Sequence, residues 1–205
     1  MSTDQIEDIS YEESVERHRK NRHRKLLRQS AAVFAKSGAL RMSMDKLGKE
    51  LGISKVVLYR YFNSKDDLIN LMLSEFSDQL LDTDSRDLGW GRKVVSANLT
   101  VVRQNQDAFL FLMRHTIHDP KFGHHYKRIH DQLVENTIER ITKDYSDIEN
   151  DVIDVEFFSR RLCTFVLDSI KGWVETGNKD KDREFVRWVV QSMAGLGRSW
   201  SEPPS

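Results

Sequence analysis

The chain has 205 residues, with 32 Lys and Arg against 32 Asp and Glu, 39% hydrophobic residues and one cysteine. A chain of this length can bury one or two hydrophobic cores, and a single cysteine excludes an internal disulfide framework. No apolar stretch is long enough to span a bilayer, and the acidic first residues do not resemble a signal peptide. With only three prolines and recurrent helical periodicity, the sequence predicts an all-α protein. The lack of a spanning segment and of a signal-peptide pattern predicts a location in the cytoplasm.

The zero net charge conceals three segments of different charge. Residues 1–16 contain six acidic residues and no basic ones, and their composition predicts a disordered leader. Residues 17–65 contain fourteen Lys and Arg against two acidic residues, whereas residues 66–205 carry a net charge of −6. The basic segment indicates binding to a polyanion such as DNA. Its first part, 17–28, is interpreted either as an arm that contacts DNA or as a solvated helix start.

Residues 43–62 have the pattern of two short helices joined by a tight turn. Ser43 is a candidate N-cap for the first helix, and apolar residues follow it at helical spacing. Gly52 can adopt the left-handed conformation that ends a helix, and Ser54 is a candidate N-cap for the second. The outward side of this second helix is expected to lack acidic residues and to suit a phosphate-lined groove, where thymine methyl groups accept apolar contacts. Its predicted members are Lys55, Val56, Val57, Tyr59, Arg60 and Tyr61.

A third helix is predicted to begin after Ser64, because Ser64 and Asp67 have the spacing of a capping box. Lys65 then lies at the start of this helix, where the helix dipole is positive and a cation is unfavourable. A phosphate near Lys65 would offset that repulsion. We therefore expect Lys65 to contact the DNA backbone.

Residues 25–76 resemble the TetR family of bacterial transcriptional regulators. The resemblance is carried by Gly-Ile-Ser-Lys-x-x-Leu-Tyr-x-Tyr-Phe at 52–62 and by Ser-Lys-x-x-Leu at 64–68. It implies contacts to base edges from Lys55, Val56 and Val57, the two valines standing where glycine and threonine are common. It implies contacts to phosphates from Ser43, Tyr59, Tyr61 and Lys65, and Ser54 and Arg60 complete the predicted DNA-binding set.

The resemblance also implies an N-terminal three-helix helix-turn-helix DNA-binding domain joined to a C-terminal helical ligand-binding and dimerisation domain. The helical pattern predicts five helices in the C-terminal part, at roughly 90–103, 106–117, 122–143, 148–176 and 180–200. The predicted organisation is a disordered acidic leader at 1–16, the DNA-binding domain at 17–64, a connecting helix at 65–82, the effector-binding and dimerisation domain at 83–200 and a disordered tail at 201–205.

In this family the last two helices form a four-helix interface between protomers, and a small molecule bound in the C-terminal domain releases the DNA. The resemblance therefore implies a homodimeric repressor that binds a palindromic operator and responds to a small-molecule effector of unknown class. The predicted interface residues are Phe165, Trp173, Trp188 and Met193. The predicted effector-binding residues, each with the alternative of an ordinary core role, are Trp90, Phe109, Phe111, Leu112, Met113, Arg114 and His115.

Two other classes of function are alternatives to a ligand-responsive regulator. An architectural or nucleoid-associated protein on the same fold would bind DNA without an effector. An enzyme is disfavoured, because the sequence lacks a glycine-rich phosphate loop, a nucleophile elbow and paired carboxylates. Five histidines between 115 and 130 include His115 and His118 at a spacing that can chelate a metal, but residues 119–123 between them and the later histidines have the pattern of a loop, where histidines are often solvated. We predict no metal site, no cofactor and no membrane partner.

Overall fold

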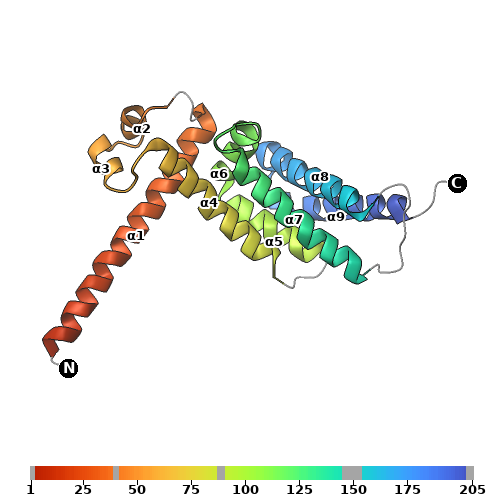
Figure 1. The fold of residues 1–205 in the computed structure, drawn as a ribbon, viewed down its shortest axis with the longest axis horizontal. Helices are drawn as coiled ribbons and strands as arrows, with labels where there is room; N and C mark the ends of the chain where they lie inside the picture. The colour runs from red at the N-terminus through yellow and green to blue at the C-terminus, as the bar shows by residue number, and fades with distance from the viewer. Residues whose placement is uncertain (1–2, 39–41, 87–90, 145–153, 202–205) are drawn as a thin grey trace. The chain divides into compact units, whose positions relative to one another are not determined.

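The computed structural model describes residues 3–38, 42–86, 91–144 and 154–201, and the regular secondary structure in these ranges is helical (Figure 1). The all-α prediction is therefore confirmed. The chain divides into two compact units, Met1–Met72 and Leu73–Ser205. The elements are α1 (Thr3–Ser37), α2 (Met44–Glu50), α3 (Lys55–Tyr59), α4 (Lys65–Asp84), α5 (Arg92–Gln104), α6 (Gln106–Phe111), the π-helical turn η1 (Leu112–Thr116), α7 (Gly123–Asp144), α8 (Val155–Thr176), the 3₁₀ turn η2 (Lys179–Lys181) and α9 (Asp182–Ser201).

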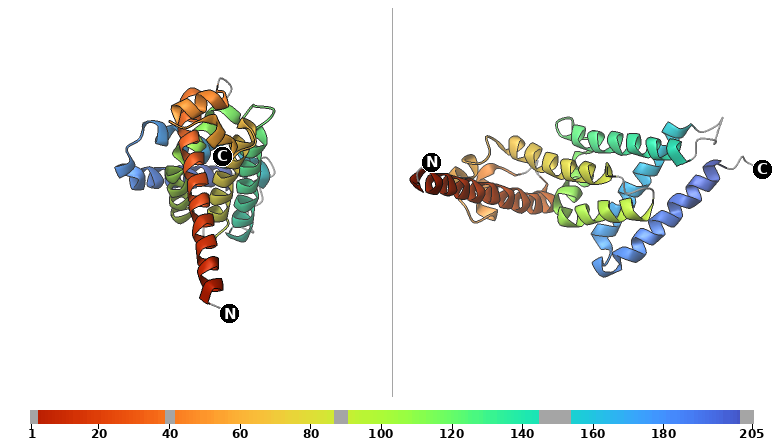
Figure 2. Two further views of the ribbon diagram at one scale, coloured as in Figure 1. Left: turned by 90° about the vertical axis from the view of Figure 1, so that its left-hand side faces the viewer. Right: turned by 90° about the horizontal axis from the view of Figure 1, so that it is seen from below.

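Helix α1 is longer than the sequence predicted, because it begins at Thr3 and includes most of the segment expected to be a disordered leader (Figure 2). No glycine or proline interrupts residues 3–37. The acidic residues precede the basic ones, an order that complements the dipole of a single continuous helix. Glu16 also lies within 3.9 Å of Arg19 and 3.8 Å of Lys20, the spacing of stabilising pairs on one helix face.

The C-terminal part of α1 provides the core of the first unit. Leu26, Leu27, Ala31 and Phe34 are buried and recur at helical spacing. Gly38, with φ 71°, ends the helix and donates its N–H to the carbonyl of Phe34 at 2.8 Å. This turn leads the chain towards α2, which packs against α1.

Helix α4 continues from the first unit into the second, and the division between the units lies within it. Leu68, Met72, Phe76 and Leu80 are buried. Leu71, three positions after Leu68, is instead 38% exposed. The buried positions are centred on another side of the helix, so a helical period of 3.6 residues turns Leu71 outwards.

The second unit is a bundle in which α7 packs on α8, and α9 packs on α5 and α8. The predicted helix at 106–117 is divided between α6 and η1. Helix α8 begins at Val155. The preceding residue, Asp154, is its N-cap, and its carboxylate accepts a hydrogen bond from the N–H of Phe157 at 2.6 Å. The earlier predicted start, 148–153, lies outside the described residues. Across the helices that the structure describes, none combines the length and apolar character needed to cross a membrane.

Candidate nucleic-acid interface

Helix α2 begins at the predicted cap. Ser43 has extended backbone angles, and its hydroxyl oxygen accepts a hydrogen bond from the N–H of Lys46 at 3.2 Å. This bond satisfies one of the N–H groups that the first turn of a helix leaves without a partner. Met44 and Leu47 are buried beneath it. The cap thus orients α2 so that its apolar side faces the core.

The turn between α2 and α3 depends on two glycines. Gly52 has φ 66°, which confirms the predicted left-handed conformation, and its N–H bonds to the carbonyl of Lys49 at 3.1 Å. Gly48 has a second role, which the sequence pattern did not reveal. A Cβ at position 48 would lie 2.8 Å from the carbonyl oxygen of Ile53, so only glycine permits this close approach of α2 to the turn. A glycine inside a helical pattern is the signal for such packing.

Helix α3 is short and is capped at its start by Ser54, whose hydroxyl accepts from the N–H of Val57 at 3.4 Å. Leu58 and, just beyond the helix, Phe62 are buried and attach this segment to the core. Val56 is 58% exposed and Tyr59 is 52% exposed, so both side chains are accessible to another surface. Lys55 and Arg60 are exposed beside them, whereas Val57 and Tyr61 are half-buried.

Lys55 has an acidic neighbour that the pattern of α3 alone does not reveal. Its Nζ lies 3.3 Å from a carboxylate oxygen of Asp45 on α2, and both side chains are mostly exposed. The prediction that this surface lacks acidic residues is therefore correct for α3 itself, but α2 places Asp45 beside it. An exposed ion pair of this kind contributes only about 0–1 kcal/mol, so Lys55 can exchange the carboxylate for a nucleic-acid acceptor at little cost.

The predicted capping box at the start of α4 is confirmed. The N–H of Asp67 donates to the Ser64 hydroxyl at 3.0 Å, and the N–H of Asn63 donates to the Asp67 carboxylate at 2.8 Å. Lys65 occupies the first helical position and is half-buried. These bonds hold Lys65 in place near the end of the segment that contains α3.

Aromatic rings connect α1 to the residues that follow α3. The His23 ring lies 5.1 Å from Phe62 and 6.3 Å from Tyr61, measured between ring centroids. Tyr61 and Phe62 are themselves 6.3 Å apart. The basic middle part of α1, residues 17–25, therefore leaves the domain beside Tyr61, one of the predicted phosphate contacts. The sequence did not indicate this proximity, because it joins residues almost forty positions apart.

On the described parts of the chain, the predicted effector-binding residues do not line either of the two cavities described below. Phe109, Phe111, Leu112 and Met113 are buried core residues, Arg114 forms an ion pair with Glu175 at 2.8 Å, and His115 is exposed. Trp90 lies outside the described residues. Two cavities in the second unit are lined by other side chains, from α4, α5, α7, α8 and α9.

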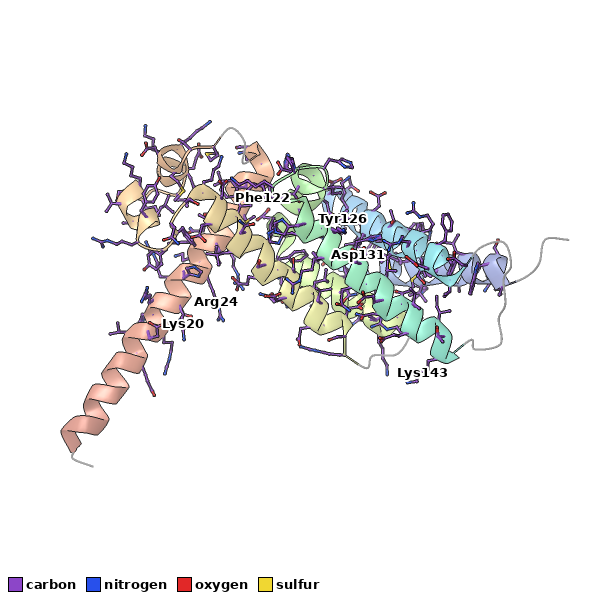
Figure 3. All side chains as sticks on the ribbon, viewed as in Figure 1. Lys20, Arg24, Phe122, Tyr126, Asp131 and Lys143 are labelled. Atoms are coloured by element: carbon purple, nitrogen blue, oxygen red, sulfur yellow. The ribbon has the colours of Figure 1, made fainter. Side chains whose placement is uncertain are left out.

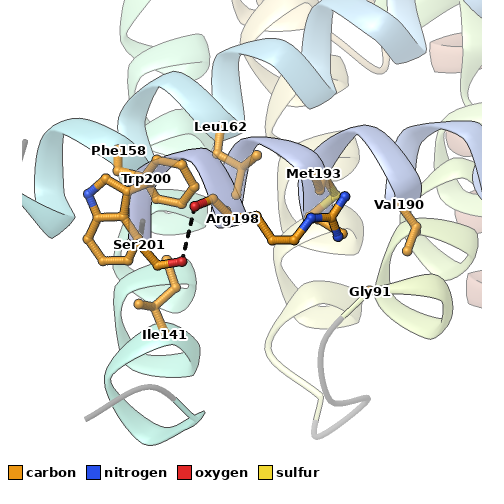
Figure 4. A pocket seen from close by; sticks show the side chains of 11 residues that line it. Gly91, Ile141, Phe158, Leu162, Val190, Met193, Arg198, Trp200 and Ser201 are labelled. Carbon is orange, nitrogen blue, oxygen red and sulfur yellow. Dashed lines mark hydrogen bonds between the residues drawn. The ribbon is translucent and has the colours of Figure 1, made fainter. Parts of the chain in front are cut away.

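The larger of these two cavities has a volume of about 240 Å³ and an apolar lining that includes Phe158, Leu162, Met193 and Trp200 (Figure 4). The smaller one, of about 60 Å³, also reaches Leu162 and Met193. Its polar lining comes from a buried network around Asp84. The carboxylate of Asp84 accepts bonds from Asn98 at 2.7 Å and Asn136 at 2.8 Å, and pairs with Arg140 at 3.1 Å.

The four predicted interface residues have different surroundings. Trp188 is 52% exposed on α9, whereas Phe165 and Met193 are half-buried. Trp173 is held within the unit, because its ring stacks on Phe185 at 4.8 Å and its indole N–H donates to Asp182 at 2.7 Å. Trp188 is therefore the residue of this set best placed to meet another surface.

The histidines between 115 and 130 are distributed among separate environments. His124 and His125 lie against each other, with ring centroids 4.1 Å apart, and His130 bonds to the Thr164 hydroxyl at 3.0 Å. Burial, followed by the charges of His124 and Arg128, lowers the pKa of His125 to about 4. Within the described ranges, no three His, Cys, Asp or Glu side chains converge as a metal site would require.

Comparison with known proteins agrees with this geometry. Residues 26–72 match the family described as bacterial regulatory proteins, tetR family. Curated relatives in two strains of Mycobacterium tuberculosis, each named an uncharacterized HTH-type transcriptional regulator, are 27% identical over 106 residues, which is 47% of this chain and 44% of theirs. The aligned part of the chain thus spans less than half the length of these relatives.

Solved structures show the same fold over most of the chain. A TetR-like transcriptional regulator from Rhodococcus sp. RHA1 is similar with a TM-score of 0.70 and 19% identity, over 87% of this chain and 96% of that one. A tetR-family regulator from Streptomyces coelicolor is similar with a TM-score of 0.64 and 18% identity, over 86% and 80%. The N-terminal helix-turn-helix domain of this chain, residues 26–72, belongs to the TetR family of bacterial regulatory proteins, and the described chain has the fold of solved regulators of that family.

Proposed function

We propose that the protein is a DNA-binding regulator of transcription, most simply a repressor acting in the bacterial cytoplasm, with α3 as the helix that enters the major groove. The observation that supports this most strongly is the exposure of Val56 and Tyr59 between two exposed cations on a helix that is capped and anchored from below. Apolar side chains can contact thymine methyl groups, while cations and hydroxyls contact base edges and phosphates. Membership of a family of regulatory proteins argues against an enzyme.

The DNA-binding proposal can be tested with a fluorescein-labelled 40-base-pair duplex of mixed sequence, followed by anisotropy. The wild-type chain should bind it at 50 mM salt, because electrostatic binding does not require the operator. A Val56→Glu, Tyr59→Glu variant places two negative charges on the exposed side of α3 and should lose at least tenfold in affinity. Equal affinity of the two proteins would contradict the proposed role of α3.

We further propose that the protein binds DNA as a homodimer through α8 and α9. A single helix-turn-helix reads few base pairs, and a two-fold pair of them reads half-sites about one turn of DNA apart. Trp188, Leu196 and Phe157 are the large exposed hydrophobic side chains on the described parts of these two helices. Sedimentation velocity should show a dimer for the wild-type chain and a monomer for Trp188→Glu, Leu196→Glu. A wild-type monomer at micromolar concentration would refute this proposal.

The two cavities support the proposal of a small, mainly apolar effector. Their shared lining residues Leu162 and Met193 join apolar space to the polar groups of Asp84 and Arg140, a combination typical of ligand sites. The probe 1-anilinonaphthalene-8-sulfonate should bind the wild-type chain and bind Ala194→Trp more weakly, since Ala194 borders the larger cavity. If the probe bound both proteins equally, an architectural DNA-binding protein without an effector would be favoured.

A further inference from the structure

A run of exposed basic residues precedes the part of α1 that is buried in the first unit. We call residues 17–25 the arm. The arm contains six Lys and Arg and no acidic residue, and each of these six side chains is exposed. The basic residues are Arg17, Arg19, Lys20, Arg22, Arg24 and Lys25. The arm is therefore a dense cationic surface outside the residues that match the family, 26–72.

The arm has a defined direction because it belongs to a continuous helix. Leu26 and Leu27, which follow it directly, are buried, and His23 within it packs on Phe62 and Tyr61. Nine residues of α-helix extend about 13 Å at a rise of about 1.5 Å per residue. Figure 3 shows Lys20 and Arg24 on this part of α1. The cations of the arm are thus arrayed along a helical segment whose C-terminal end lies beside the predicted DNA contact Tyr61.

The ion pairs that Glu16 forms with the arm are weak. Glu16 lies 3.9 Å from Arg19 and 3.8 Å from Lys20, but the two basic side chains are about 70% exposed. Exposed ion pairs contribute about 0–1 kcal/mol, so a stronger anion can replace this carboxylate. A phosphodiester backbone is such an anion, because it presents many closely spaced charges and releases bound counterions when it is neutralised.

The composition of this helical segment favours DNA over an anionic membrane. A helix that lies in a membrane interface needs a broad apolar face opposite its basic one. Between residues 13 and 25, Val15 is the single aliphatic or aromatic residue apart from the histidines. Along B-DNA each strand carries about one phosphate per 3.4 Å of axis, so a 13 Å arm spans about four phosphates of one strand. This spacing suits two or three simultaneous contacts.

We propose that the arm is a second DNA-binding surface, which contacts the phosphodiester backbone beside the segment read by α3 without regard to base sequence. This inference rests on the proposed function, because it requires α3 to place the domain on DNA. The arm then adds affinity and salt dependence, and it lengthens the region of DNA that each protomer covers.

The test compares two variants of the full chain that change the net charge equally. The arm variant is Arg17→Gln, Lys20→Gln, Arg22→Gln, and the body control is Lys93→Gln, Lys127→Gln, Lys143→Gln, all exposed positions. Glutamine is a good helix former, so circular dichroism should confirm that α1 persists. Binding to the 40-base-pair duplex is measured by anisotropy between 50 and 200 mM salt.

The arm variant should bind the duplex more weakly, and its slope of log Kobs against log salt should be less negative by about 2–3 per protomer, about 0.9 for each phosphate that the arm neutralises in the wild-type complex. The body control should keep the wild-type slope. If wild-type, body control and arm variant all bind with the same slope, the inference is overturned while the proposed function stands. If the wild-type chain does not bind the duplex at 50 mM salt, the proposed function itself fails.

A second measurement separates DNA from lipid as the source of phosphate. Wild-type chain and arm variant are mixed with vesicles of phosphatidylcholine and phosphatidylserine at a ratio of 3:1, and sedimented. Neither protein should sediment with the vesicles. Vesicle binding by the wild-type chain and not by the arm variant, together with an unchanged salt slope on DNA, would overturn the inference and identify the arm as a membrane-binding surface.

Discussion

Replacing Gly48 with alanine should push α2 away from the turn that leads into α3. The added Cβ would lie 2.8 Å from the carbonyl oxygen of Ile53, about 0.6 Å closer than an ordinary contact, and 3.4 Å from the N–H nitrogen of Lys55. Both neighbours are backbone atoms, which cannot rotate aside as a long side chain can. The carbonyl of Gly48 also accepts from the N–H of Ile53 at 2.9 Å, so any displacement stretches this bond.

The expected magnitude follows from two opposing effects. Overpacking of this kind costs about 1–3 kcal/mol, and alanine in a helix interior gains about 1 kcal/mol over glycine. The helix-turn-helix should therefore lose up to about 2 kcal/mol of local stability. Because α3 must shift relative to α2, affinity for DNA should fall about tenfold, which corresponds to about 1.4 kcal/mol.

Hydrogen exchange of the full chain, measured on peptides that cover residues 44–62, reports this local stability. All four tryptophans, at 90, 173, 188 and 200, belong to the second unit, so their fluorescence checks that this unit is unaffected. Gly172→Ala is the matched control, because a Cβ there would meet no atom within 4 Å and should stabilise α8 by about 0.5–1 kcal/mol. Unchanged or slower exchange and full DNA affinity in Gly48→Ala would refute the steric argument.

Four further predictions concern local changes to the chain or to the pH. Lys55→Ala should relax base preference at one operator position by about 1–3 kcal/mol. Lys65→Ala should instead weaken binding to all sequences alike and reduce the slope of log Kobs against log salt by about one. Both are measured on operator and mutated-operator duplexes, and equal losses of affinity on every duplex for Lys55→Ala would exclude base reading. Deleting residues 1–12 should tighten DNA binding severalfold at low salt, because four acidic residues that repel phosphates are removed; weaker binding would contradict this. The folded-state pKa of His125, about 4, lies below its ordinary value of 6.5, so the free energy of unfolding should fall by about 1–3 kcal/mol as the pH drops from about 6.5 to about 4. In urea titrations, His125→Asn should reduce this loss of stability. A pH profile of stability that is the same in the variant and the wild-type chain would contradict the role of His125.

The local features of the first unit could be predicted from the sequence because each depends on residues a few positions apart. The caps at Ser43 and Ser54, the turn at Gly52 and the capping box of Ser64 and Asp67 all have short-range hydrogen-bond patterns. The structure confirms each of them. The steric role of Gly48 is also local, but it depends on a distance that spacing alone does not supply.

The features that were not predicted depend on contacts between distant segments. The Lys55–Asp45 pair joins two helices, and the contact of His23 with Tyr61 joins α1 to the residues after α3. Composition suggested a disordered leader, but an uninterrupted chain with acids before bases forms helix from Thr3. The cavities have linings from five helices, so the position of Met193 beside them was not visible in any single apolar pattern.

We expect the cationic helix-turn-helix, with α3 exposed, to direct this chain to particular DNA sequences. The most direct test is to incubate the wild-type chain and the Val56→Glu, Tyr59→Glu variant with sheared genomic DNA of the source organism, and to sequence the retained fragments. The wild-type chain should enrich fragments that share an inverted repeat with half-sites about one helical turn apart, and the variant should enrich none. Retention of the same fragments by both proteins, or no enrichment by the wild-type chain at low salt, would contradict the account.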